Sequence, residues 1–158
     1  GKGTVFDVLI PAVDRRAKQK EQKLIAEVVS PPTQCEQVVL LVEDEAPVRA
    51  FASRALRIKG LTVYEADCAE AALKILEDKS LKIDVFVTDV VMPGLDGPTW
   101  VRLALMDRPG TRVVFVSGYA EDAFEKQQSE IEGSVFLPKP FSLNDLTQAV
   151  LDVVVPAS

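Results

Sequence analysis

From Gln37 onward the chain alternates short apolar runs with helical patterns, and this alternation limits the fold more than any other feature of the sequence. Five runs rich in Val, Ile, Leu and Phe are typical of buried strands: 38–43, 61–65, 83–88, 111–117 and 134–137. A segment with helical periodicity follows each run: 46–59, 69–79, 98–107, 121–131 and 142–154. Strands and helices that alternate at this spacing predict an α/β fold with a parallel sheet.

The predicted sheet is doubly wound, with helices on both faces. Because short parallel crossovers are right-handed, few topologies remain, and we expect the flavodoxin-like one. It has five parallel strands in the order 2-1-3-4-5 and five helices. This order places the carboxyl ends of the first and third strands side by side, where open α/β sheets bind their ligands.

Local signals set the predicted helix ends. Pro47 lies near the start of the first helix, and Gly60 follows its last residue. Ser142 and Asp145 form a variant capping box at the start of the last helix. Between the third strand and its helix, Gly94, Asp96 and Gly97 turn the chain, as Gly and Asp do in turns and caps.

The first 36 residues do not follow this alternation. The pattern of residues 1–13 predicts a glycine turn and a single strand, which is not stable alone, and residues 14–36 read as a charged, Gln-rich linker with Ser-Pro-Pro-Thr near its end. We therefore expect a remnant of an upstream domain (1–13), a linker (14–36) and a main domain (37–155). The chain begins with Gly rather than Met, which suggests a piece of a larger protein.

The charge distribution argues against a nucleic-acid partner. The net charge is −6, and residues 37–158 carry 19 of the 24 acidic residues but only 12 of the 18 basic ones, which gives −7 there. An acidic main domain lacks the basic surface that nucleic-acid binding needs. No apolar stretch reaches the ~18 residues of a membrane-spanning helix, so we expect no membrane contact by this chain.

The chain contains no histidine. This excludes a Ser-His or Cys-His nucleophile, a histidine-ligated zinc site and a phosphohistidine within the chain. Its two cysteines, Cys35 and Cys68, have neither metal-binding nor redox spacing. That usage is typical of a reducing cytosol, and we expect a cytoplasmic location.

Two of the strand-like runs end in carboxylates. The first leads into Glu43-Asp44-Glu45, and the third ends at Asp89, just before a Pro/Gly turn. In the predicted strand order Glu43, Asp44 and Asp89 converge, and each ionised pair about 5 Å apart repels by ~3 kcal/mol at an effective dielectric constant near 20. A cation or a raised pKa must offset that repulsion. An oxygen-rich site without histidine suits Mg²⁺.

We assign the Mg²⁺ ligands from this pattern. Asp44 and Asp89 are the expected direct ligands, and Glu43 acts through a water molecule. The backbone carbonyl of Val91 is the remaining ligand that the protein supplies. One carboxylate would remain free to accept a phosphoryl group.

Two further strand ends carry polar side chains. Ser117 ends the fourth strand, and Lys139 follows the fifth. Lys139 can pair with Asp89 and later with a phosphoryl oxygen, while the Ser117 hydroxyl can hydrogen-bond the same group. This set can position and neutralise an in-line phosphoryl transfer.

Residues 37–154 resemble the receiver domain of two-component response regulators. The matching motifs are Glu43-Asp44, Asp89 with its Met-Pro-Gly-Leu-Asp-Gly tail, Ser117 and Lys139-Pro140. The resemblance implies that Asp89 is the phosphoacceptor, that Mg²⁺ is the cofactor and that a phosphohistidine protein is the donor. It also implies a cis peptide bond before Pro140, which spacing alone does not establish because most X–Pro bonds are trans.

The same resemblance implies a conformational switch. Ser117 would move toward the phosphoryl group, and an aromatic residue on the fifth strand would respond. That residue is Phe136, which lacks the hydroxyl of the commoner Tyr. Val91 and Tyr119 flank the pocket where family members tune the lifetime of the phosphoryl group, and no rate follows from them.

A second resemblance concerns the parent protein. Residues 1–13 are similar to the end of a histidine kinase ATP-binding domain, and segments 117–122 and 136–143 resemble the C-terminal receiver of a CckA-type cell-cycle hybrid histidine kinase. This implies a membrane-anchored parent kinase with phosphotransferase activity. Its partners would be a histidine phosphotransferase and its own histidine-bearing domain. The direction of phosphoryl flow in this phosphorelay stays open. This chain alone would accept and hydrolyse an aspartyl phosphate, and its oligomeric state stays open between monomer and weak or crystal dimer.

Three other functions compete with this interpretation. A phosphatase of the haloacid dehalogenase type needs a second acid two residues after its nucleophile, where this chain has Val91. A flavin-binding module needs a phosphate-binding loop after its first strand, where this chain has Glu43-Asp44-Glu45. A pseudo-receiver that docks without phosphorylation would not need the acidic pair together with Asp89 and Lys139.

Overall fold

The computed structural model of the chain describes residue 3, residues 36–118 and residues 131–154. The chain divides into two units, 1–34 and 35–158, and the description below concerns the second. The expected domain remnant except Gly3, the expected linker except Glu36, and the predicted helix over 121–131 except Ile131 lie outside the described residues. Ile131 lies in a bend.

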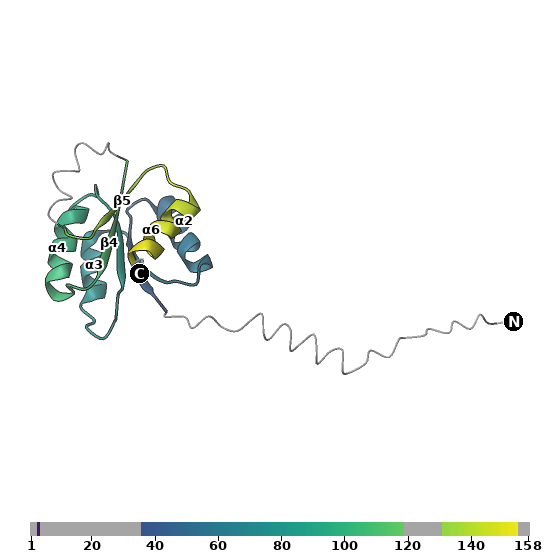
Figure 1. Cartoon of the computed structure of the whole chain (residues 1–158), viewed down its shortest axis with the longest axis horizontal. Coiled ribbons are helices and arrows are strands. Elements are labelled where there is room, and N and C mark those ends of the chain that lie inside the picture. The colour runs from purple at the N-terminus through teal and green to yellow at the C-terminus, as the bar shows by residue number, and fades with distance from the viewer. Residues whose placement is uncertain (1–2, 4–35, 119–130, 155–158) are drawn as a thin grey trace. The chain divides into compact units, whose positions relative to one another are not determined.

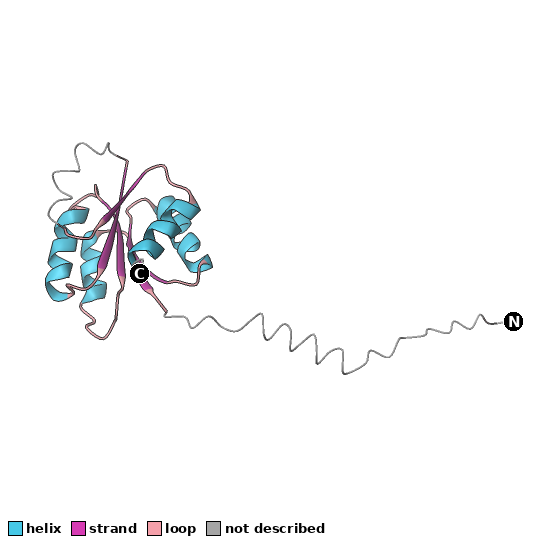
Figure 2. Ribbon diagram, viewed as in Figure 1, coloured by secondary structure: helices cyan, strands magenta, loops and turns pink. Residues whose placement is uncertain are grey.

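The second unit contains a five-stranded sheet in the order β2-β1-β3-β4-β5 (Figure 2). All neighbouring strands are parallel. The strands are β1 (Val38–Val42), β2 (Thr62–Ala66), β3 (Val85–Asp89), β4 (Arg112–Ser117) and β5 (Val135–Pro138). The predicted flavodoxin-like fold and strand order are therefore confirmed.

Two helices cover each face of the sheet among the described residues (Figure 1). On one face lie α3 (Ala69–Leu76) and α4 (Gly97–Asp107), and on the other lie α2 (Ala46–Ile58) and α6 (Leu143–Val154). These four match four of the five predicted helices. None of the described helices is long and apolar enough to cross a membrane.

Alternating side chains of the strands build two cores. Leu40, Phe86 and Phe115 face α3 and α4, where the buried Trp100 meets Phe86 edge-on at 5.2 Å between ring centroids. The intervening strand residues face α2 and α6, whose Leu56 and Leu146 are fully buried. A sheet buried on both faces explains why its strands are continuous apolar runs in the sequence.

The helix ends follow the predicted signals at two places. Gly60 adopts a φ of 85° just after α2, a conformation that glycine reaches without steric cost. At the start of α6, the Ser142 N–H donates to Asp145 Oδ2 at 2.9 Å and the Asp145 N–H donates to Ser142 Oγ at 3.1 Å. The capping box is therefore confirmed.

The end of α3 corrects a prediction. The sequence pattern predicts a helix to Lys79, but α3 ends at Leu76. The Arg108 guanidinium, at the end of α4, donates to the carbonyl oxygens of Leu76, Asp78 and Leu81. A partner about 30 residues away along the chain therefore satisfies carbonyl oxygens at and after the end of α3 that the helix itself leaves unpaired.

All the strands after β1 begin later than predicted, β2, β4 and β5 by one residue and β3 by two. Leu61 lies between α2 and β2, where its N–H donates to the Leu56 carbonyl at 3.2 Å, and β2 starts at Thr62. β3 starts at Val85 rather than residue 83. Just before it, the Asp84 carboxylate accepts the Val38 N–H at 2.9 Å.

Candidate functional site

Three carboxylates meet at the carboxyl edge of the sheet. Glu43 and Asp44 follow β1, and Asp89 is the last residue of the neighbouring β3. One ligand oxygen from each of the three lies within 4.8 Å of the others. Glu43 and Asp89 are buried, while Asp44 is exposed.

Lys139, just after β5, reaches into this cluster. Its Nζ donates to Asp89 Oδ2 at 2.7 Å and to Glu43 Oε2 at 3.0 Å. The Lys139 side chain is only 20% exposed, so both ion pairs are partly shielded from water. One ammonium against three carboxylates leaves a net negative pocket, which favours a further cation.

Burial and pairing shift the pKa of two groups here. Burial raises the pKa of Glu43, and the hydrogen bond from Lys139 only partly opposes this. Burial alone would lower the pKa of Lys139, but its hydrogen bonds to Asp89 and Glu43 outweigh burial and leave its pKa raised. Lys139 is therefore a firmly held cation at neutral pH.

The carboxylates differ in how much of their hydrogen-bonding capacity is used. Glu43 Oε1 accepts from the Glu45 N–H at 3.3 Å and Oε2 accepts from Lys139. In the described part of the chain, no group donates a hydrogen bond to the Asp44 carboxylate. An exposed carboxylate beside a buried one is a donor set that fits a hard divalent cation such as Mg²⁺, which prefers oxygen ligands and keeps several waters.

Asp89 is fixed by its surroundings. Its Oδ1 accepts from the Val91 N–H at 3.0 Å, and its Oδ2 accepts from Lys139. Behind it, the buried Trp100 Nε1 donates to Thr88 Oγ1 at 3.0 Å, and the Thr88 hydroxyl donates to the Asp89 carbonyl at 2.9 Å. Both carboxylate oxygens and the carbonyl oxygen of Asp89 thus accept hydrogen bonds.

Gly97 closes the turn behind the site. A Cβ atom on Gly97 would lie 2.2 Å from the Asp89 carbonyl oxygen, far inside any real contact. The Gly97 N–H also donates to the Val90 carbonyl at 3.0 Å. The glycine therefore lets α4 begin directly against the backbone of Asp89.

The other predicted site residues lie along the same edge. Ser117 is the last residue of β4 and is 2% exposed. Its carbonyl accepts from the Lys139 N–H at 2.7 Å. Phe136 lies beside Phe115 in the sheet register and packs partly buried against the core under α3 and α4. The switch assigned to Ser117 and Phe136 stays a prediction.

Two backbone features concern the predicted ligands. The peptide bond between Lys139 and Pro140 is cis, which confirms the expectation from the family resemblance. Val91 is exposed at its side chain and bonded to Asp89 through its N–H, and the role of its carbonyl as a metal ligand stays a prediction.

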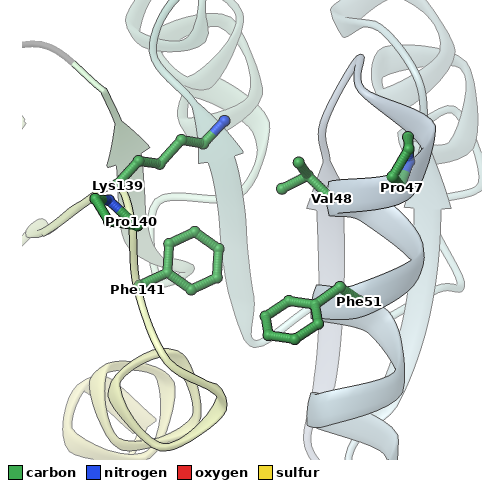
Figure 3. Close-up of a pocket in the computed structure, with 6 residues that line it drawn as sticks. All are labelled: Pro47, Val48, Phe51, Lys139, Pro140 and Phe141. Carbon is green, nitrogen blue, oxygen red and sulfur yellow. The ribbon is translucent and has the colours of Figure 1, made fainter.

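An apolar groove of about 500 Å³ opens beside Lys139. Figure 3 shows it between the start of α2 and the segment that follows β5. Pro47, Val48 and Phe51 line one wall, and Pro140 and Phe141 line the other. The rings of Phe51 and Phe141 are tilted by 47° with centroids 6.3 Å apart, so each wall of the groove carries an aromatic ring.

Two features of the site were not predicted from the sequence. Arg49 Nη1 donates to the Glu43 carbonyl at 2.7 Å, and the core residue Trp100 also anchors Thr88. The relay through Thr88 leaves no local sequence signal. Arg49 did leave a sequence signal, because it lies in the N-terminal part of α2, where a cation opposes the helix dipole.

Comparison with known proteins gives consistent matches. The model of the response regulator receiver domain matches residues 39–151. The sensor kinase CckA of Brucella abortus (strain 2308) is 40% identical over 163 residues, which cover 98% of this chain and 17% of that protein. The response regulator GacA of Pseudomonas aeruginosa is 36% identical over 73% of this chain and 54% of that protein. The chain thus spans only part of these relatives.

Solved structures agree with these matches. The receiver domain from the hybrid histidine kinase CckA is 38% identical, with a TM-score of 0.64 over 75% of this chain and 99% of that chain. A response regulator receiver protein from Sinorhizobium medicae WSM419 is 26% identical, with a TM-score of 0.69 over 76% of this chain and 95% of that chain.

Proposed function

The chain belongs to the response regulator receiver domain family, and from this premise we propose that it accepts a phosphoryl group on Asp89 in a Mg²⁺-dependent reaction. One observation carries the proposal above all: Asp89 lies at the carboxyl edge of the sheet, grouped with Glu43 and Asp44 and bonded to Lys139. The acceptor thus lies beside both the candidate metal ligands and the counter-ion.

The residues divide the work of in-line transfer. A carboxylate oxygen of Asp89 attacks the phosphorus atom, an acyl phosphate forms, and the bond from phosphorus to the donor breaks. Asp44 and Asp89, with Glu43 through water and the Val91 carbonyl, would hold Mg²⁺, which supplies charge neutralisation and orientation when bound. The Lys139 ammonium, already 2.7 Å from Asp89 Oδ2, would pair with a phosphoryl oxygen.

Ser117 and Phe136 are the proposed readers of the new phosphoryl group. Ser117 lies at the end of β4, and β5, which carries Phe136, is its neighbour in the sheet. A hydrogen bond from the Ser117 hydroxyl to the phosphoryl group would draw the end of β4 inward and free space for Phe136 to turn. Because Phe136 has no hydroxyl, packing rather than a hydrogen bond would hold its new position.

We further propose that the partners are histidine-bearing phosphotransfer proteins. A relative that aligns with nearly the whole chain is the sensor kinase CckA of Brucella abortus, which supports a hybrid histidine kinase as the parent protein. The apolar groove formed by α2 and Phe141 opens beside Lys139, whose ammonium group contacts Asp89. This groove is the surface that such a partner would cover.

Acetyl phosphate with Mg²⁺ tests the acceptor directly. We expect the mass of the protein to rise by one phosphoryl group, and Asp89→Asn to abolish this gain. Asp152→Asn, an exposed carboxylate on α6, is the matched control and should label like the wild type. Unchanged labelling of Asp89→Asn would place the acceptor elsewhere.

Labelling by acetyl phosphate and a separate assay of phosphate-monoester turnover together distinguish the competing functions. A docking pseudo-receiver would remain unlabelled in the wild type. A phosphatase of the haloacid dehalogenase type would hydrolyse a phosphate monoester in multiple turnovers, but at the position of its general acid/base this chain has Val91. No label in the wild type would favour the first alternative, and steady monoester turnover the second.

A further inference from the structure

Arg49 stands apart from the groups discussed above, because it touches the backbone of the acidic loop rather than its carboxylates. Its Nη1 donates to the Glu43 carbonyl at 2.7 Å and approaches the Asp44 carbonyl at 3.5 Å. Its own N–H donates to the Glu45 carbonyl at 2.9 Å. One residue of α2 therefore contacts three consecutive residues of the loop.

The position of Arg49 is electrostatically unfavourable unless these contacts compensate. It lies in the N-terminal part of α2, where the helix dipole disfavours a positive charge. The N-cap residue Glu45 makes no side-chain capping bond. The carbonyls of Glu43 and Asp44 point their negative ends at the guanidinium and so offset this cost.

The loop is anchored on its other side by the sheet. The Glu43 N–H donates to the Ala66 carbonyl at the end of β2, at 3.1 Å. With the Glu43 carbonyl held by Arg49, both backbone polar groups of this residue are fixed. The direction in which Asp44 leaves the loop then depends on the peptide that Arg49 holds.

Building on the proposed function, we infer that Arg49 is a positioning residue for the metal site: its guanidinium fixes the Glu43–Asp44 peptide so that the Asp44 carboxylate is presented to a divalent cation. Arg49 touches neither the cation nor the phosphoryl group. Its contribution is therefore to the geometry of the ligand, which outer partners of metal ligands commonly control.

The direction in which Arg49→Met changes the Mg²⁺ affinity distinguishes a positioning role from the effect of charge alone. If Arg49 acted only as a nearby positive charge, Arg49→Met would remove a repulsion and tighten Mg²⁺ binding. If Arg49 positions Asp44, the same change frees the loop and weakens Mg²⁺ binding about tenfold, the lower end of the loss seen when an outer partner is removed. Arg49→Lys, which keeps the charge and can reach one carbonyl, should fall between the two.

The measurement is an NMR titration of the labelled whole chain with MgCl₂, followed through backbone amide shifts and without any phosphodonor. Arg54→Met is the matched control, because Arg54 is exposed on the same helix and should leave affinity unchanged. Urea unfolding without Mg²⁺ measures fold stability separately. A variant that is less stable but binds Mg²⁺ like the wild type would assign Arg49 a purely structural role and overturn the inference.

The outcomes also separate this inference from the proposed function. Tighter or unchanged Mg²⁺ binding in Arg49→Met, with normal labelling of the wild type by acetyl phosphate, overturns the role of Arg49 alone. A wild type that binds no Mg²⁺ overturns both the metal site and the inference that depends on it. Weaker binding in Arg49→Met with intermediate binding in Arg49→Lys supports it.

Discussion

At the scale of single residues, the tightest constraint on the site is the contact between Gly97 and Asp89. The Asp89 carbonyl oxygen occupies the place where a Cβ atom of residue 97 would lie, 2.2 Å away. The carbonyl belongs to the backbone and a Cβ atom is bonded directly to Cα, so no side-chain rotation can separate them. Any side chain at position 97 must therefore displace either the start of α4 or the acceptor residue itself.

We predict that Gly97→Ala lowers the free energy of unfolding by about 3 kcal/mol, the upper range for overpacking a filled site. In an open helix position the same change would stabilise by up to ~1 kcal/mol, so the sign identifies the clash. Urea unfolding measures the change. Gly110→Ala is the control, because nothing lies within 4 Å of its added Cβ, and it should stay within about 0.5 kcal/mol.

Single residues also show where prediction from the sequence ends. The convergence of Asp44, Asp89 and Lys139 was predictable, because each follows an apolar run and parallel strands align their carboxyl ends. The hydrogen bonds from Arg49 to the acidic loop depend on where a flexible side chain points, and the hydrophobic pattern of the sequence does not encode this.

At the scale of elements, the start of α6 depends on one reciprocal pair. Ser142 and Asp145 each accept the N–H of the other, so two donors that the helix leaves unpaired are satisfied. This helix packs Leu146 and Val150 against the sheet on the face that it shares with α2. A frayed start would loosen that packing next to Phe141.

We predict that Ser142→Ala destabilises the protein by about 1 kcal/mol, the usual cost of losing a capping hydroxyl. Thermal unfolding at neutral pH measures it. Thr99→Ala is a useful comparison, since Thr99 donates to the cap Asp96 only through its backbone N–H and should cost less.

The capping box also has a pH dependence with a definite sign. The N–H and hydroxyl of Ser142 hold the pKa of Asp145 below its ordinary value. A lowered pKa in the folded state means that the contribution of Asp145 is present at neutral pH and is lost as the pH falls below 3.8 through the folded pKa. The effect of Asp145→Asn should therefore disappear in acid.

Element ends were less predictable than element types. The capping box and Gly60 were visible because cap chemistry is local. The early end of α3 was not, because Arg108 reaches its carbonyls from another helix. Local signals fix an end only where no distant group competes for the same backbone atoms.

At the scale of the whole molecule, α2 and the segment after β5 are distant in sequence but form one surface beside the acceptor. Phe51 and Phe141 pair across the groove, and Phe51 is 44% exposed. Exposing an aromatic ring to water is unfavourable on a free surface, and such residues are common anchors in interfaces.

We predict that Phe51→Ala slows phosphoryl transfer from a phosphorylated histidine phosphotransferase about tenfold, equivalent to ~1.4 kcal/mol of lost binding. Labelling by acetyl phosphate should not change, because a small donor needs no docking surface. Ile58→Ala is the control, since Ile58 lies on the same helix with 69% exposure but outside the groove. Equal slowing of both donors would indicate damage to the pocket rather than to docking.

The overall topology was the most predictable level, because five buried runs with helices between them leave few arrangements. The groove was not predictable, since it depends on how two aromatic rings from opposite ends of the domain meet. Surfaces formed between elements depend on tertiary packing, which local sequence patterns do not determine.

The bond from Trp100 to Thr88 has one more consequence. Trp100 is the single tryptophan of the chain, and its indole lies one hydroxyl away from the backbone of Asp89. Ultraviolet emission from the indole therefore originates beside the acceptor, with no second fluorophore of its kind to dilute the signal. The domain thus contains an intrinsic optical probe of its own chemistry.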